Sequence, residues 1–119
     1  MKIAMIGTGY VGLVTGICFS DFGHNVVCVD KDPIKIALLN DGKVPIYEPG
    51  LDALMAKNVA GGRLSFTEDL KSAVDGADAV FIAVGTPTRR GDGHADLTYV
   101  YAAAEEVAHL LSDYTVVVT

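Results

Sequence analysis

Residues 2–30 read KIAMIGTGYVGLVTGICFSDFGHNVVCVD, and this stretch decides the fold. Residues 2–6 and 26–30 are short, nearly continuous apolar runs, which predict two buried strands. Residues 10–22 between them predict a buried helix, and Gly23 stands where a glycine commonly ends a helix. The sequence therefore begins with a strand–helix–strand unit, the building block of a parallel sheet.

The same alternation continues to the end of the chain. Further helices are predicted at about 33–40, 49–58, 68–74 and 97–111, and further strands at 64–66, 79–84 and 115–118. Thr67 and Asp96 are the expected caps of the last two helices, and residues 85–94 are expected to form a loop. Because the strands are apolar throughout, both faces of the sheet should be covered by helices. We predict an α/β, Rossmann-like, doubly wound parallel sheet with strand order 3-2-1-4-5, truncated after about the fifth strand.

Residues 7–12, GTGYVG, match the pattern G-x-G-x-x-G between the first strand and the first helix. In that place Gly7 permits a tight turn, Gly9 lets the backbone approach a pyrophosphate, and Gly12 lets the helix pack closely. The pyrophosphate would lie at the helix N-terminus, where the N–H groups of Tyr10 and Val11 can hold it. The pattern alone is a weak signal, and its position after a strand gives it meaning.

Asp30 ends the second predicted strand, 18 residues after Gly12. A carboxylate in this position accepts hydrogen bonds from the hydroxyls of the adenine ribose, and it disfavours a 2′-phosphate. NAD is therefore favoured over NADP, although Lys31 and Lys35 could soften the repulsion. The alternatives are a solvated carboxylate at a strand end and a solvated helix lysine at position 35, and from the residues alone the lysine alternative is preferred.

Thr86 lies in the segment VGTPT, directly after the fourth predicted strand. Ligands of open α/β sheets bind at the carboxyl ends of the strands where the strand order reverses, here between strands one and four. Thr86 is therefore placed to reach the cofactor by its hydroxyl or backbone. The alternative is a turn residue before Pro87.

The composition of the 119 residues, 12.5 kDa, is that of one domain and excludes several classes of function. The formal net charge of −6 argues against nucleic acid and anionic membranes as partners. The uncharged stretch 3–20 could be a signal peptide or a membrane span, but its glycines argue against both. Cys18 and Cys28 are expected in the core, in a reducing, cytoplasmic setting. No metal-ligand spacing is found, and Glu105-Glu106 is expected to be a solvated helix face.

Four segments carry a resemblance over essentially the whole chain: MKIAMIGTGYVGLVTG, VVCVDKDPIKIALLNDGKVPIYEPGL, GRLSFTEDL and FIAVGTPTRRGDGHADLTYV. With these segments the chain resembles the N-terminal NAD-binding domain of the UDP-glucose/GDP-mannose dehydrogenase family. IYEPGL and the pair VGTPT and ADLTYV are far more specific than the glycine pattern.

The resemblance implies that Tyr10, Val11, Asp30, Lys35 and Thr86 contact NAD. It also implies an enzyme that oxidises the C6 alcohol of UDP-glucose with two NAD, first to an aldehyde and then, through a cysteine thioester, to the carboxylate of UDP-glucuronate. In the family the catalytic residues and most substrate contacts lie later in the chain. Residues 1–119 are therefore expected to be a cofactor-binding fragment, inactive alone, of a homo-oligomeric enzyme, with no catalytic residue of its own.

Two alternatives remain at this point. Another nucleotide sugar, such as GDP-mannose, could be the substrate. A protein of a different class, an NAD-sensing regulatory Rossmann module such as those of potassium channels, has a similar length and the same first strand–helix–strand unit. The helix predicted at 49–58 and the VGTPT loop favour the dehydrogenase.

Overall fold

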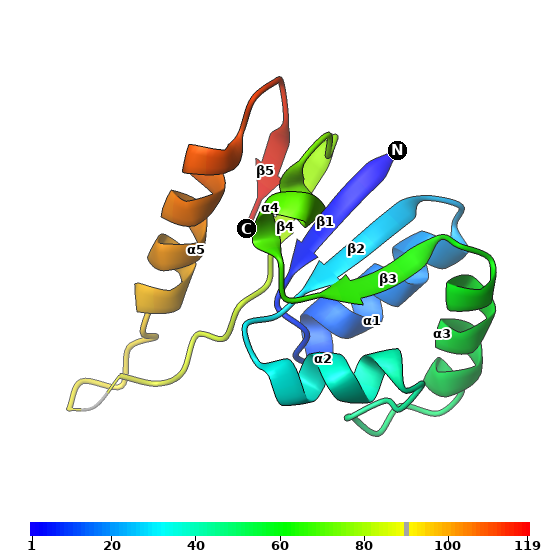
Figure 1. The fold of residues 1–119 in the computed structure, drawn as a ribbon. Helices are drawn as coiled ribbons and strands as arrows, with labels where there is room; N and C mark the ends of the chain where they lie inside the picture. The colour runs from blue at the N-terminus through cyan, green and yellow to red at the C-terminus, as the bar shows by residue number, and fades with distance from the viewer. Residues whose placement is uncertain (90) are drawn as a thin grey trace.

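In the computed structural model, which describes residues 1–89 and 91–119, five parallel strands form one sheet (Figure 1). The predicted strand order is confirmed: the sheet runs β3-β2-β1-β4-β5. Its members are β1 (Lys2–Ile6), β2 (Asn25–Val29), β3 (Leu64–Thr67), β4 (Ala79–Ile82) and β5 (Val116–Val118). The strand order reverses between β1 and β4, and the carboxyl ends of these two strands lie side by side.

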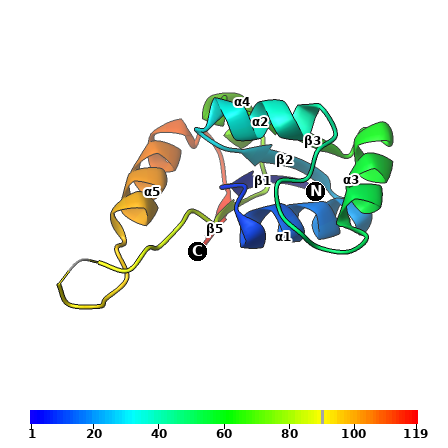
Figure 2. The ribbon, with the colours of Figure 1, turned by 90° about the horizontal axis from the view of Figure 1, so that it is seen from below.

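Helices cover both faces of this sheet (Figure 2). They are α1 (Tyr10–Asp21), α2 (Pro33–Asn40), α3 (Leu51–Ala60), α4 (Leu70–Val74) and α5 (Thr98–Leu110). Figure 2 shows α1 on one face and α4 on the other, with α5 set apart beside β5. Alternate strand residues enter two separate cores: Ile3 and Met5 pack on the side of α1, whereas Ala4 and Ile6 pack on the side of α4. Burial on both faces explains why the strands are apolar throughout.

Some boundaries differ from those predicted, for local reasons. β4 ends at Ile82 rather than at residue 84, because its partner β1 turns away after Ile6; the N–H of Ala83 makes the last bond, to Ile6 O at 2.8 Å. α3 begins at Leu51 because Gly50 adopts a left-handed conformation, with φ of +82°. The backbone caps of α4 and α5 are Asp69 and Leu97 instead of Thr67 and Asp96.

The predicted capping side chains nevertheless act just outside these helices. Thr67 Oγ1 accepts a hydrogen bond from the Asp69 N–H at 3.0 Å, and Asp96 Oδ1 accepts one from the Thr98 N–H at 2.9 Å. In the loop before α5, Thr88 and Ala95 form an isolated antiparallel bridge. Arg90 of this loop lies outside the described residues. Among the described residues, no helix combines the length and the apolar character that crossing a membrane requires.

Candidate functional site

The turn between β1 and α1 is fixed by Gly7. Its φ is +103°, which an L side chain rarely adopts, and a Cβ on it would lie 2.6 Å from the carbonyl oxygen of Ala83. Its N–H donates to Val29 O at 2.8 Å, so that the turn is tied to the end of β2. Gly7 therefore sits where the carboxyl ends of β1, β2 and β4 meet.

Gly12 and Gly9 are glycines for different reasons. A Cβ on Gly12 would lie 2.0 Å from Gly7 O, so the first turn of α1 packs directly against the backbone of the glycine turn. Gly9 has an ordinary φ of −72°, and a Cβ there would meet nothing within 4 Å. The fold itself does not require glycine at position 9. The open space beside it is what a ligand that approaches the backbone needs, and in this respect the turn fits a dinucleotide pyrophosphate.

The N-terminus of α1 faces this space. The first bond of the helix runs from Leu13 N to Gly9 O at 2.9 Å, so the preceding N–H groups, including those of Tyr10 and Val11, lie ahead of the intrahelical bonds. No side chain caps the helix, and both Tyr10 and Val11 are exposed. Free N–H groups and the positive end of the helix dipole together form a site suited to an anion.

Asp30 follows β2 and is held in one orientation by the backbone and by Thr8. Its Oδ2 accepts hydrogen bonds from the Thr8 N–H at 3.0 Å and from Thr8 Oγ1 at 2.7 Å, and its Oδ1 accepts one from the Asp32 N–H at 2.9 Å. A carboxylate offers about four acceptor positions, so these bonds leave a position on Oδ1 for a ligand.

The same bonds keep Asp30 ionised. Burial raises the pKa of Asp30, but the hydrogen bonds from Thr8 and Asp32 and the charge of Lys35 outweigh it and hold the pKa below its ordinary value. Thr8 is almost completely buried. Sequence reasoning missed its role, although a hydroxyl residue between the first two glycines, opposite a carboxylate at a strand end, is a signal that could have indicated it.

Lys35 and Thr86 lie near the glycine turn and Asp30, but within the described part of the chain no hydrogen bond ties either side chain to them. Lys35 lies one turn into α2, near enough to Asp30 for its charge to affect the carboxylate. Thr86 is exposed in the connection after β4, which leaves the sheet next to Gly7. All eight sequence-predicted residues thus lie in the connections at the carboxyl ends of the strands or in the first turns of the helices that follow. They are Gly7, Gly9, Tyr10, Val11, Gly12, Asp30, Lys35 and Thr86.

Tyr10 also makes a contact that the sequence did not reveal. Its hydroxyl donates to Glu48 Oε2 at 2.5 Å, which joins the start of α1 to the segment between α2 and α3. This hydrogen bond and the negative charge of Glu48 raise the pKa of Tyr10. The bond places the IYEPGL segment beside the glycine turn.

The two cysteines lie apart from this site. Cys28 is buried in β2, and burial raises the pKa of its thiol to about 12. Cys18, in α1, is only half-buried, where the sequence predicted a core residue. Within residues 1–89 and 91–119, no three acidic, histidine or cysteine side chains are grouped as metal ligands.

Known proteins resemble this chain over its whole length. Residues 1–119 match the family described as UDP-glucose/GDP-mannose dehydrogenase family, NAD binding domain. The chain is 71% identical over 119 residues to UDP-glucose 6-dehydrogenase of Rhizobium meliloti, covering 100% of this chain and 27% of the relative. It is 55% identical over 117 residues to UDP-glucose 6-dehydrogenase TuaD of Bacillus subtilis, covering 98% of this chain and 25% of the relative.

Solved structures agree with this match. The chain superposes on GDP-mannose dehydrogenase from Pseudomonas aeruginosa, determined as a ternary complex, with a TM-score of 0.93 and 43% identity; the match covers 98% of this chain and 27% of that one. The chain thus spans about a quarter of the length of the proteins that it matches.

Proposed function

This chain belongs to the UDP-glucose/GDP-mannose dehydrogenase family, and we propose that it is the cofactor-binding part of an NAD-dependent UDP-glucose 6-dehydrogenase. One observation supports the cofactor site above the others. Gly9 has no conformational or packing reason to be glycine, and it lies at the uncapped N-terminus of α1, on the loop that also carries Thr8, the partner of Asp30.

Each residue of the site then has a role. The N–H groups of Tyr10 and Val11 bind the pyrophosphate, and Gly7 and Gly12 hold the turn that presents them. Asp30 accepts a hydrogen bond from a ribose hydroxyl, Lys35 contacts NAD and balances the charge of Asp30, and Thr86 contacts NAD from the end of β4. When bound, NAD accepts the hydride that the oxidation of the sugar alcohol releases.

Residues 1–119 are proposed to form a domain fragment that holds the cofactor, while the substrate and the catalytic residues are held by the rest of the enzyme. UDP-glucose is preferred as substrate because the relatives of 71% and 55% identity carry that name, whereas GDP-mannose dehydrogenase is a relative of 43% identity. A cytoplasmic, homo-oligomeric enzyme is the corresponding proposal for the full-length protein.

The test combines binding with turnover. Calorimetric titration of the full-length protein should show NAD binding, and absorbance should show NADH formed with UDP-glucose and not with GDP-mannose. Residues 1–119 alone should form no NADH. Failure to bind NAD would contradict the proposed cofactor site. NADH formation with GDP-mannose alone would contradict UDP-glucose as the substrate. Turnover by residues 1–119 would contradict the proposal that the rest of the enzyme holds the catalytic residues.

A further inference from the structure

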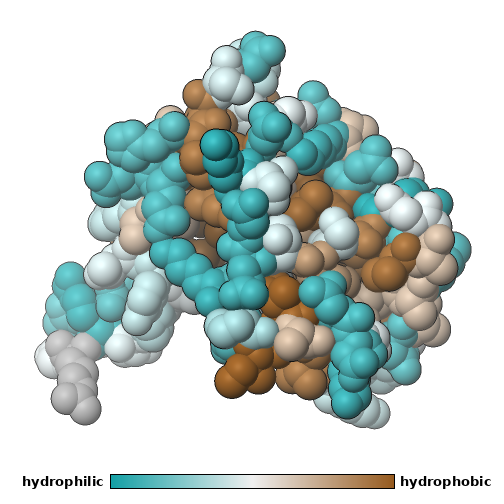
Figure 3. Space-filling view, viewed as in Figure 1, coloured by the Kyte–Doolittle hydropathy of each residue, from teal (hydrophilic) through white to brown (hydrophobic). Residues whose placement is uncertain are grey.

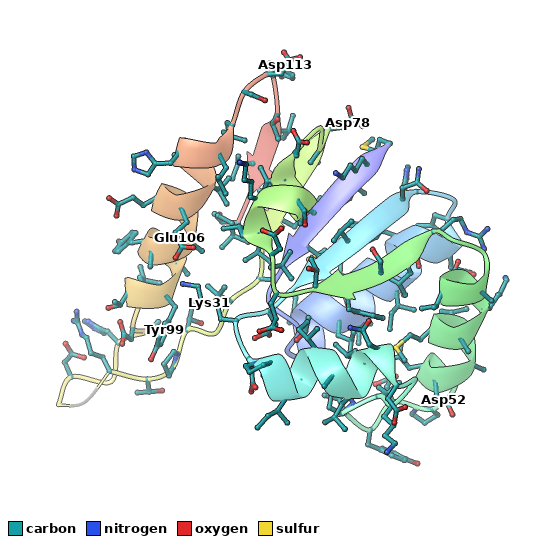
Figure 4. The ribbon with its side chains drawn as sticks, in the orientation of Figure 1. Lys31, Asp52, Asp78, Tyr99, Glu106 and Asp113 are labelled. Atoms are coloured by element: carbon teal, nitrogen blue, oxygen red, sulfur yellow. The ribbon has the colours of Figure 1, made fainter. Side chains whose placement is uncertain are left out.

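Lys31 and Glu106 form an ion pair between parts of the chain that are far apart in sequence. Lys31 follows Asp30 directly, and Glu106 lies in the middle of α5. The distance from Lys31 Nζ to Glu106 Oε1 is 2.6 Å. Figure 4 shows the two side chains meeting between α5 and the turn after β2. The sequence predicted a solvated face at Glu105-Glu106; Glu105 is exposed, whereas Glu106 is half-buried and paired.

The position of Lys31 gives this pair its significance. In related folds an arginine near the end of the second strand accommodates the 2′-phosphate of NADP, and a lysine there can supply the same positive charge. Lys31 is such a side chain, and its Nζ is drawn toward α5 by Glu106 instead. From the sequence alone, Lys31 weakens the expected preference for NAD. The ion pair removes this difficulty.

The other charged side chains near the proposed ribose position, Lys35 and Asp32, also have partners within the protein. Lys35 lies close enough to Asp30 to lower its pKa, and Asp32 Oδ1 accepts a hydrogen bond from the Ile34 N–H at 2.9 Å as the cap of α2. With Lys31 paired to Glu106, neither described lysine of this turn is left as an uncompensated positive charge.

We propose that Glu106 is a specificity-determining residue for the cofactor: it engages Lys31, the residue next to Asp30, and so keeps this cation from pairing with a 2′-phosphate. The inference rests on the NAD site proposed above, and it adds a residue that does not itself contact the cofactor. Asp30 repels the 2′-phosphate directly, whereas Glu106 acts through Lys31. Because Lys31 is largely exposed and Glu106 is partly exposed, the effect should be modest and should weaken as salt is added.

The test measures binding, so that it does not depend on turnover. The full-length protein is titrated in a calorimeter with adenosine 2′,5′-bisphosphate and with adenosine 5′-monophosphate, and then with NADP and NAD. Glu106→Gln is compared with Glu105→Gln, a matched control that removes the same charge from the neighbouring exposed position. The double variant Lys31→Ala/Glu106→Gln shows whether Lys31 carries the effect.

For Glu106→Gln we expect about two- to fivefold tighter binding of the bisphosphate and of NADP, the size of one partly screened charge contact. Glu105→Gln should change both by less than about twofold, and the double variant should lose the gain. Equal gains in the two glutamine variants, or a gain that survives without Lys31, would overturn this inference while leaving NAD binding intact. A wild-type protein that does not bind NAD would overturn the proposed function and this inference with it.

Discussion

Two strand–helix–strand units of the sheet, β1-α1-β2 and β4-α5-β5, each join neighbouring parallel strands through one helix, but they are constructed very differently. In the first, β1-α1-β2, the strand and helix are joined by residues 7–9 alone, and α1 buries five residues: Gly12, Leu13, Gly16, Ile17 and Ser20. In the second, β4-α5-β5, the connection runs from 83 to 97 and α5 buries only Ala103 and Val107. The backbone of the first unit is fixed by its own residues. The second unit leaves much of its surface open.

The exposed residues of the second unit are apolar as well as polar. Val116 and Val117 of β5 are 46% and 41% exposed, and Tyr99 and Tyr101 of α5 are also exposed. Figure 2 shows α5 and the loop before it projecting from the sheet. The short connection between β1 and α1 thus forms an anion site whose geometry its own residues determine. The long connection between β4 and α5 leaves a surface whose packing depends on more distant parts of the protein.

The largest expected contrast is in the free energy of unfolding. Ile17 is completely buried against β1 and β2, and Ile17→Ala should destabilise the protein by about 2–5 kcal/mol. Val117→Ala, at an exposed position of β5, should change stability by less than about 0.5 kcal/mol. Urea denaturation of both variants measures the difference. Equal losses would show that the two units are equally well packed in the full-length protein.

A second contrast lies within the glycine turn. Gly12→Val places atoms against the backbone of Gly7 and should cost about 1–3 kcal/mol of stability. Gly9→Ala meets nothing within 4 Å and should leave the unfolding midpoint unchanged while it weakens NAD binding. Thermal unfolding without cofactor and calorimetry with NAD separate the two roles. An unchanged midpoint for Gly12→Val would mean that this glycine serves ligand access rather than packing.

The third prediction concerns Asp30, where the first unit ends. Asp30→Asn keeps an oxygen for Thr8 but removes the charge, and NAD binding should fall about tenfold, equivalent to one charge-assisted hydrogen bond. NADP binding should suffer less, because the repulsion of the 2′-phosphate is removed as well. Parallel titrations with both cofactors check this. An equal loss for the two cofactors would exclude a role of Asp30 in discrimination.

The smallest expected effect is electrostatic. Thr8→Val removes a hydrogen bond to the Asp30 carboxylate, so the pKa of Asp30 should rise toward its ordinary value; carboxyl carbon NMR can measure the change. Because the folded pKa lies below the unfolded value, Asp30 stabilises the fold fully above about pH 4 and loses this contribution as the pH falls through the folded pKa. An unaltered pKa in Thr8→Val would show that the backbone bonds alone hold it down.

Sequence reasoning was most successful in the first unit. The apolar strands and the glycine pattern follow from short-range patterns; the strand order of the whole sheet was predicted from the fold class that they indicate, and it is confirmed. Residue-level roles within the site stay predictions. The contacts of Thr8 with Asp30, Tyr10 with Glu48 and Lys31 with Glu106 were missed, because they join segments 22, 38 and 75 residues apart. The contact of Thr8 with Asp30 had a signal in the glycine pattern, whereas the other two pairs depend on how α1 and α5 pack, which no local pattern encodes.

The surface of α2 shows the same limit. Figure 3 shows apolar side chains at the lower edge of the molecule, and a shallow apolar pocket lies on the outer side of α2. It is lined by Pro33, Ile34, Ala37, Leu38 and Asp41. The sequence predicted the helix correctly, but the periodicity of so short a segment did not indicate that its outer side would be apolar.

The burial of Cys28 has a consequence for time-resolved experiments. Its thiol is fully enclosed in β2 against α1, and a pKa of about 12 leaves almost no thiolate at neutral pH. An alkylating reagent reacts with thiolate and so reaches Cys28 only while the sheet is transiently open. The rate at which Cys28 is alkylated therefore reports how often β2 and α1 separate. Cys28 can therefore serve as an intrinsic probe of domain opening, and the more accessible Cys18 as the reference for reagent reactivity.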